Sequence, residues 1–482
     1  AAGVPVLIRR WQWPADVTTA PQLHPPADMP CGSSCFTGQE PWLQKLSDGF
    51  FPILHLAAGA PEAEQRMMAT RQAVLQPKVV RGLGGLGKTE LAVQYALQQW
   101  RAGRYQCVVF VVVPDTPLEQ GAGVIEGLER ELLRRMVRAL PLAAEVKAQM
   151  AEEADLEVVR HTVHAWLGEH AGWLLLVDNA DDAASLKPGA AGFVRLCLPP
   201  KAAPGHVLLT SRVGTQDFGA IGASALQLQL LSKAVVADDV TAAEVLLLRH
   251  AREGLGHDVC TDVDVAKMVT QLEPSEREAV AWLAGDEGVA GLPLAIQQAG
   301  DAIRENEGET FAGYCELYRT RRIAFFADGP EGKNREAQSA HTTFCIGFER
   351  LERQNPAAAQ LLALCAYLAP EAIPLSLFTR ALPVQPELQA LLRAAASPAE
   401  ALRPLVRAAQ KLSLLTPGGS GEAQTVSMHR MVQQAMHARL DARSGAASGQ
   451  EAVGLLIELL VAEMSGIEYG MACAGEAMER FH

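Results

Sequence analysis

The segment GLGGLGKT, from Gly82 to Thr89, limits the possible folds of this chain more than any other feature. It matches the pattern of a glycine, four residues, a second glycine, a lysine and a serine or threonine. Glycines in such a loop allow backbone conformations that turn several amide hydrogens toward one anion. The apolar pair Val79 and Val80 precedes the loop, and an amphipathic segment from Thr89 to Trp100 follows it. A strand, a glycine-rich loop and a helix in this order predict a phosphate site at the positive end of the helix.

The residues of this loop predict a purine nucleotide, ATP or ADP, together with Mg²⁺. Lys88 can reach the β- and γ-phosphates, and the hydroxyl of Thr89 is the expected magnesium ligand. The predicted nucleotide-binding residues are the four motif glycines, the lysine and the two residues after it: Gly82, Gly84, Gly85, Gly87, Lys88, Thr89 and Glu90. A glycine-rich turn without a ligand is the alternative, and the flanking strand and helix signals weigh against it.

Three further apolar segments lie beyond the loop, at 107–113, 173–177 and 207–209. Their apolar residues are continuous rather than alternating, which is typical of strands covered on both faces in a parallel sheet. Helical sequence separates the segments, for example near Glu126 to Leu140, where apolar residues recur at helical spacing. The predicted fold class is therefore α/β, with a doubly wound parallel sheet behind the phosphate loop.

The segment WLLLVDNADD places Asp178 at the carboxyl end of a predicted buried strand, where sheets of this kind bind ligands. Its carboxylate is the second expected magnesium ligand, although an acid at a strand end is often only a helix cap. Asn179 comes next, so no adjacent carboxylate is available to activate water. Hydrolysis of ATP is therefore predicted to be slow, unless Asp181 or Asp182 reaches the site.

The segment HVLLTSR ends another predicted strand at Arg212. A guanidinium group binds phosphate oxygens in pairs, so Arg212 could distinguish a triphosphate from a diphosphate. A solvated surface arginine is the alternative. Lys88, Asp178 and Arg212 form the predicted catalytic set of a slow ATPase.

A chain of 482 residues exceeds the size of one ordinary core, which predicts several domains. Beyond Leu231 the strand signal disappears, and helical sequence leads to a polar stretch typical of a linker. Further on, LSLLT, PGGSGEAQ and TVSMH predict a hairpin before a last helix, from about His429 to Leu440, as in a winged-helix domain. The predicted organisation is a linker or the tail of a missing domain at 1–32, a nucleotide-binding domain at 33–230, a helical lid domain at 231–325, a linker at 326–340, a winged-helix domain at 341–445 and the start of a repeat-like helical region at 446–482.

Charge and composition limit the partners and the compartment. The chain has 42 basic and 55 acidic residues, a net charge of −13, which disfavours polyanions such as DNA on average. No apolar run approaches the roughly 20 residues that span a membrane, and the amino-terminal residues contain no apolar signal sequence. The nine scattered cysteines are typical of reduced thiols, so we expect a soluble cytoplasmic protein. His161 and His164 have zinc-like spacing but no further ligands.

The order of motifs resembles that of the NB-ARC branch of the STAND P-loop signalling NTPases, over roughly residues 36–440. The resemblance rests on FTGQE, VVRGLGGLGKTELAVQYA, LLLVDNADD, HVLLTSR, GLPLAIQQAG and VSMHRMVQQ, and it is strongest to members with a tetratricopeptide or similar repeat array after the winged helix. It implies that Pro293 packs against adenine and that His429 contacts the β-phosphate of ADP in the resting state. From the residues alone, Pro293 is a helix-start proline and His429 a strand-end or helix-start histidine. Arg430 stands where many members of the family have Asp.

The leading functional prediction is a signalling switch that binds ADP at rest and ATP when active, hydrolyses ATP slowly and self-associates on activation. A protein ligand or effector would act through flanking domains. A transcription regulator that binds DNA through the winged helix is the alternative, because Arg403, Arg407 and Lys411 fall on one helix face. A solvated helix face explains these charges more simply. A metabolic P-loop enzyme is a third possibility, but no segment beyond the nucleotide site indicates a substrate pocket.

Overall fold

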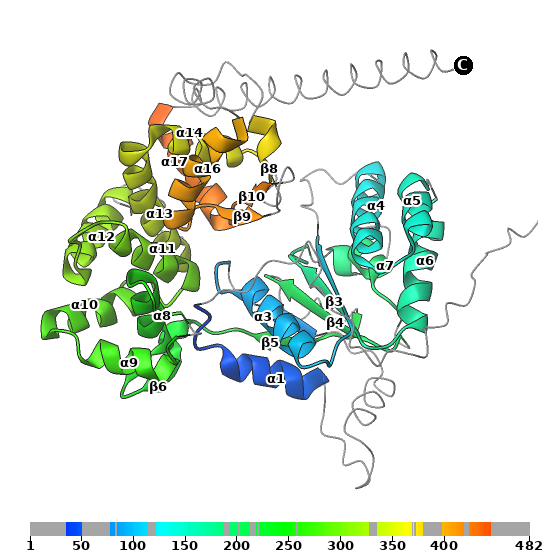
Figure 1. The fold of residues 1–482 in the computed structure, drawn as a ribbon, viewed down its shortest axis with the longest axis horizontal. Coiled ribbons are helices and arrows are strands. Elements are labelled where there is room, and N and C mark those ends of the chain that lie inside the picture. Colours follow the sequence, from blue (N-terminus) through cyan, green and yellow to red (C-terminus); the bar gives the residue numbers. More distant parts are fainter. Residues whose placement is uncertain are drawn as a thin grey trace, which may run out of the picture.

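A computed structural model describes residues 35–50, 78–81, 84–113, 122–153, 155–182, 184–187, 192–200, 203–212, 218, 221–256, 259–326, 335–368, 370, 373–378, 398–418 and 424–444. The predictions for residues 1–32, for Gly82 and for residues 446–482 lie outside these ranges. A sheet with its covering helices comes first along the chain. Two helical groups follow, and Figure 1 shows them lying together on one side of the sheet.

A parallel sheet of five strands forms the first part of the molecule, the sheet domain. The strands are β1 (Lys78–Arg81), β2 (Cys107–Val112), β3 (Trp173–Asp178), β4 (His206–Ser211) and β5 (Ser224–Gln227), in the order β2-β3-β4-β1-β5. All neighbouring pairs are parallel, which confirms the predicted α/β fold class. The sequence pattern does not predict β5, because its residues, SALQ, are mostly exposed and contain no apolar run.

Helices cover both faces of this sheet, because successive strand residues point to opposite sides. The helices are α1 (Glu40–Phe50), α3 (Lys88–Arg101), α4 (Ala122–Ala139), α5 (Ala144–Glu152), α6 (Leu156–Glu169), α7 (Phe193–Cys197) and the 3₁₀ helix η1 (Ala184–Leu186). Leu176 of β3 packs in one core with Leu91 of α3. Leu175, its neighbour, packs in a second core with Leu132 of α4. The sheet is therefore doubly wound, as predicted.

The next group, the helical group, contains α8 (Ala242–Ala251), α9 (Asp262–Thr270), α10 (Pro274–Ala284), α11 (Pro293–Arg304) and α12 (Phe311–Phe326). The prediction of helical sequence alone after Leu231 is wrong at one point. The 3₁₀ helix η3 (Leu231–Lys233) leads into a small hairpin of β6 (Val235–Ala237) and β7 (Val240–Thr241). Asp238 and Asp239 turn this hairpin with positive φ angles of 46° and 62°, which aspartate tolerates better than most residues.

The last described elements form the C-terminal group. Its helices are α13 (Arg335–Gln354), α14 (Pro356–Cys365), the 3₁₀ helix η4 (Leu375–Phe378), α16 (Pro398–Lys411) and α17 (Arg430–Ser444). A small antiparallel sheet accompanies them, in the order β8 (Ile373–Pro374), β10 (Thr425–Ser427) and β9 (Thr416–Gly418). Helices with a small β-hairpin are the arrangement that the sequence predicts for this region.

Two details of the C-terminal group differ from the sequence prediction. The first hairpin strand begins at Thr416, whereas LSLLT was expected to form it, because Leu414 and Leu415 are buried and Ser413 turns the chain with a φ of 52°. α13 begins at Arg335, so the end of the predicted linker is helical.

Polar contacts join the helical and C-terminal groups. The hydroxyl of Thr343 donates to Oε1 of Gln298 at 2.8 Å, and the hydroxyl of Ser413 donates to Asp301. Nζ of Lys411 lies 2.8 Å from Oε2 of Glu305. These bonds connect α13 and the end of α16 to α11 and its carboxyl end, so the two groups pack as one unit. No helix in the described ranges combines the length and the apolarity that a membrane span needs.

Candidate nucleotide-binding site

The phosphate loop connects β1 to the amino end of α3. Gly87 caps this helix in the left-handed region, at φ 79°, and Gly85 lies there too, at φ 74°. A β-carbon on Gly85 would stand 3.0 Å from Sδ of Met431 and 3.3 Å from the β-carbon of Leu294. Both conformation and space therefore require glycine at position 85. The first backbone N–H groups of α3 have no partner within the helix, so they can bind an anion at this loop.

The segment before α1 supports the loop from behind. Nε2 of Gln39 donates to the carbonyl oxygen of Leu86 at 3.1 Å, and a β-carbon on Gly87 would lie 3.2 Å from the same nitrogen. The hydroxyl of Thr37 lies 3.3 Å from Oδ1 of Asp262, which ties this segment to α9. The motif FTGQE therefore positions the loop, a role that the sequence prediction did not assign.

Lys88 begins α3 and is 8% exposed. Burial lowers the pKa of its amino group to about 8, with Asp181 and Asp178 opposing the shift and Arg212 adding to it. These interactions bring the predicted lysine, magnesium-binding acid and sensor arginine into one site. A buried ammonium group near two carboxylates is well placed to exchange them for phosphate oxygens.

Asp178 lies at the centre of the predicted magnesium site. Its Oδ1 accepts from the hydroxyl of Thr89 at 2.8 Å and from the hydroxyl of Thr210, on β4, at 2.5 Å. Burial raises the pKa of this carboxyl, while the two hydroxyls and Lys88 oppose the shift. The two predicted magnesium ligands thus lie within hydrogen-bond distance of each other, close enough for one small cation to contact both. Thr210 therefore fixes the carboxylate of Asp178. The sequence does not predict this role, because Thr210 lies on a different strand.

The acids after Asp178 have separate partners. Asp181 accepts from the backbone N–H of Arg212 at 2.7 Å and from its Nε at 2.6 Å. Asp182 accepts from the backbone N–H of Ala184 at 2.9 Å and so caps η1. Asn179 turns the chain at φ 62°. Of the acids after Asp178, Asp181 interacts with Lys88 and so reaches the site. Its carboxylate, however, already binds Arg212.

His429 meets the phosphate loop from the C-terminal group. Its side chain is exposed, and its Nδ1 accepts from the backbone N–H of Met431 at 3.1 Å. Desolvation of the ring, followed by the positive charges of Lys88, Arg212 and Arg430, lowers the pKa of His429 below its usual value. The imidazole is therefore neutral at pH 7, and with Nδ1 accepting, its proton lies on Nε2. A solvent-accessible N–H donor beside a lysine and two arginines fits a phosphate oxygen.

Pro293 and Glu90 complete the set of predicted residues. Pro293 is the first residue of α11, and the backbone N–H of Leu294 donates to the carbonyl oxygen of Gly85 at 3.3 Å. α11 therefore begins directly against the phosphate loop, where its proline can flank a bound base. Glu90 lies on α3, and its Oε1 accepts from Nε2 of Gln94 at 2.9 Å.

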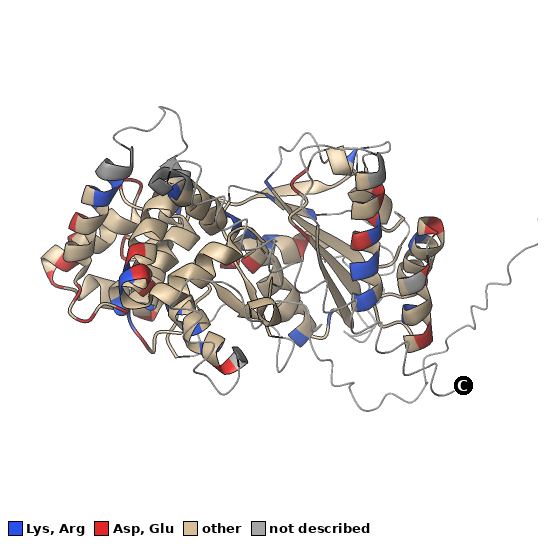
Figure 2. Ribbon diagram, turned by 90° about the horizontal axis from the view of Figure 1, so that it is seen from above, with Lys and Arg blue, Asp and Glu red and all other residues tan. Residues whose placement is uncertain are grey.

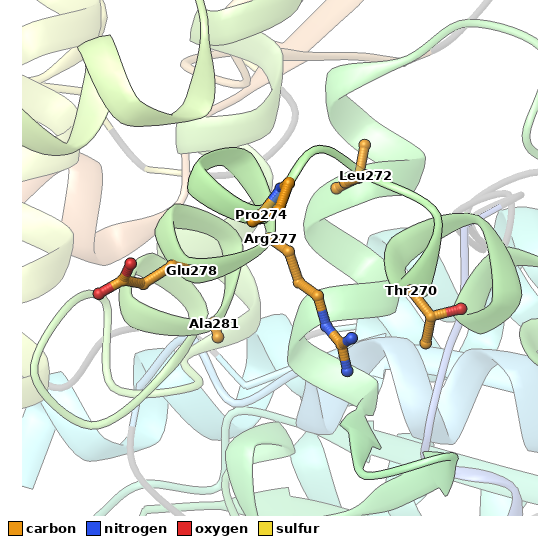
Figure 3. A pocket seen from close by; sticks show the side chains of 6 residues that line it. All are labelled: Thr270, Leu272, Pro274, Arg277, Glu278 and Ala281. Atoms are coloured by element: carbon orange, nitrogen blue, oxygen red, sulfur yellow. The ribbon is translucent and has the colours of Figure 1, made fainter.

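A pocket of about 380 Å³ lies elsewhere, between α9 and α10 (Figure 3). It contains none of the predicted nucleotide-binding residues. Its lining offers one cation and one carboxylate among small or apolar side chains: Thr270, Leu272, Pro274, Arg277, Glu278 and Ala281. The described residues also contain no group of three or more His, Cys, Asp or Glu side chains arranged to hold a metal ion.

Comparison with known proteins identifies relatives of this chain. Residues 349–444 match a family model described as a domain of unknown function, DUF7779. The regulatory protein AfsR of Streptomyces coelicolor is 28% identical over 355 residues, which cover 73% of this chain and 28% of that protein. A nucleotide-binding leucine-rich repeat (NLR)-like protein of Hyaloscypha variabilis is 26% identical over 319 residues, covering 62% of this chain and 28% of that protein. The chain thus spans little more than a quarter of the length of either relative.

A solved structure of the Orc1 protein of Aeropyrum pernix in complex with DNA matches 81% of this chain and 95% of that chain, at 12% identity. Its TM-score of 0.28 is too low to carry an argument. The phosphate loop, the parallel sheet and the two relatives instead support a relationship between this chain and P-loop NTPases of the STAND type.

Proposed function

We propose that this protein is a nucleotide-operated regulatory switch of the NB-ARC type, with ADP bound at rest and ATP bound in the active state. One observation carries the proposal. The loop and strands of the sheet domain, the first turn of α11 and His429 of the C-terminal group converge on one place. A nucleotide bound there would touch all three parts, so its identity can control how they are arranged.

The donor set fits Mg²⁺ and a polyphosphate. Thr89 and Asp178 would hold the ion, which neutralises charge on the phosphates. Lys88 would bind the β- and γ-phosphates, and Arg212 would detect the γ-phosphate. Asn179 directly follows Asp178, and Asp181 is paired with Arg212, so neither position offers a free carboxylate to take a proton from water. We therefore expect turnover below about 1 s⁻¹, the lower end of ordinary enzymes.

His429 makes the C-terminal group part of the resting state. We expect His429→Ala to speed the release of ADP by roughly tenfold to a hundredfold, because a hydrogen bond to a charged group contributes about 1.5–3 kcal/mol. Stopped-flow release of a fluorescent ADP measures this rate. His161→Ala, on the exposed face of α6, serves as the control and should leave the rate unchanged. Equal release rates for the His429 variant and the unmodified protein would remove this histidine from the site.

Nucleotide affinity should depend on pH through Lys88. Its pKa is about 8 in the free protein, and bound phosphate stabilises the charged form, so binding takes up a proton above that pH. ADP affinity is therefore fully present below pH 8 and is lost as the pH rises, by up to about tenfold per pH unit. Calorimetric titration between pH 7.5 and 10 tests this. Lys88→Arg, which does not titrate in this range, should bind with a flat profile.

The DNA-binding alternative gains no support from the C-terminal group. Lys411, one of the three basic residues behind that idea, is paired with Glu305 of the helical group. Figure 2 shows acidic and basic residues interspersed along the helices rather than gathered on one of them. Self-association on ATP binding, cytoplasmic location and an effector bound through flanking domains remain part of the proposal. Light scattering of the purified chain with ADP and then with ATP tests the first of these.

A further inference from the structure

We propose that Asp181 and Arg430 form an interdomain ion pair through which the γ-phosphate sensor, Arg212, controls the docking of the C-terminal group. This inference rests on the proposed function. It adds the pair of residues that converts phosphate detection into movement of the C-terminal group.

One carboxylate oxygen serves two arginines from different parts of the molecule. Oδ2 of Asp181 lies 2.6 Å from Nε of Arg212 and 3.9 Å from Nη1 of Arg430. Asp181 follows β3 and Arg212 follows β4, whereas Arg430 is the first residue of α17. The side chains of Asp181 and Arg430 are 13% and 18% exposed, so solvent screens this pair less than a surface pair.

The residues beside Arg430 also face the sheet domain. His429 precedes it and interacts electrostatically with Lys88. Met431 follows it, with Sδ 3.1 Å from the β-carbon that Gly84 lacks and 3.0 Å from that of Gly85. His429, directly before α17, and the first two residues of that helix therefore all face the sheet domain.

The bonds that join the C-terminal group to the helical group lie elsewhere. They run through Thr343 and Gln298, and through Ser413 and Asp301. Loss of the Asp181–Arg430 pair would leave them intact. The C-terminal group would therefore stay attached to the helical group when its contact with the sheet domain is lost.

The carboxylate of Asp181, which both arginines share, explains how ATP could release the C-terminal group from the sheet domain whereas ADP does not. A γ-phosphate near Arg212 competes with Asp181 for the guanidinium group. Asp181 then loses the contact from Nε of Arg212 that fixes its carboxylate where Arg430 meets it, so the ion pair with Arg430 weakens. ADP lacks this third phosphate, so both arginines stay on Asp181.

A double-mutant cycle tests the pair, with the release rate of fluorescent ADP as readout. Arg430→Ala and Asp181→Ala should each speed release by about tenfold, equivalent to about 1.4 kcal/mol. The double variant should be no faster than the faster single variant, because the second change removes a partner already lost. Arg430→Lys should restore most of the slow release. Arg403→Ala, on the exposed face of α16, is the control.

The same variants separate this inference from the proposed function. Effects that multiply in the double variant, or singles that release ADP at the unmodified rate, would overturn the ion pair while leaving nucleotide binding intact. If no variant binds nucleotide, the proposed function fails. X-ray scattering of the ligand-free chain then decides on the pair alone: Arg430→Ala should enlarge the radius of gyration, and an unchanged radius would overturn the pair.

Discussion

Lys88→Ala is expected to weaken the binding of both ADP and ATP by at least about a hundredfold, because it removes charge-assisted bonds to two phosphates, each worth about 1.5–3 kcal/mol. The amino group is buried at the first turn of α3, among Asp178, Asp181 and Arg212. No other lysine side chain in the described ranges is buried. Isothermal titration calorimetry measures both affinities.

The variant should keep its fold, because alanine suits a helix start and removes a buried charge. Its melting temperature without nucleotide should match that of the unmodified protein or exceed it. Lys267→Ala, on an exposed position of α9, is the matched control and should bind normally. An unchanged affinity in the Lys88 variant would mean that the loop does not hold the phosphates.

Asp178→Asn is expected to abolish the strengthening of ATP binding by Mg²⁺ and to lower the already slow hydrolysis by about a hundredfold, the scale typical of a lost electrostatic group. The substitution keeps the side-chain volume, and its amide oxygen can still accept from the hydroxyls of Thr89 and Thr210. It removes the charge that would hold the ion. Titrations with and without Mg²⁺, together with phosphate release, measure both effects.

Asp182→Asn provides the matched control within the same segment. Asp182 caps η1 through its Oδ1, and asparagine caps equally well, so this variant should bind Mg²⁺ and ATP normally. If Asp178→Asn keeps its magnesium dependence, or if the Asp182 variant loses it, the ion is held by other groups.

The parts of the site that the sequence predicts are those set by local order along the chain. A loop of glycines between a strand and a helix brings its own geometry, so the roles of Lys88 and Thr89 follow from neighbouring residues. Asp178 and Arg212 follow from a general property of parallel sheets, whose strands end at a common edge. The strands that carry them are neighbours in the sheet.

The remaining parts depend on contacts that no local pattern records. Gln39 supports the loop from a position far earlier in the chain, through one bond to a carbonyl oxygen. Thr210 is one of many threonines, and only the register of β3 against β4 brings it to Asp178. β5 escapes prediction because an edge strand with exposed residues needs no apolar run.

The prediction that His429 and Pro293 lie at the site rests on the resemblance to a known family rather than on local sequence. Their residues alone indicate a strand-end or helix-start histidine and a helix-start proline, and the structure places His429 directly before α17 and Pro293 at the start of α11. Their roles beside the loop were implied by the resemblance of motif order. The electrostatic interaction of His429 with Lys88, and the bond from Leu294 to Gly85, are the observations that bring both residues to the site.

The central claim is that a nucleotide occupies the space between the phosphate loop, α11 and His429. Mass spectrometry of small molecules released from the purified, denatured chain tests it most directly. We predict one ADP or ATP per chain, or stoichiometric uptake of added ADP. A chain that releases no nucleotide and takes up neither ADP nor ATP in the presence of Mg²⁺ would contradict the account.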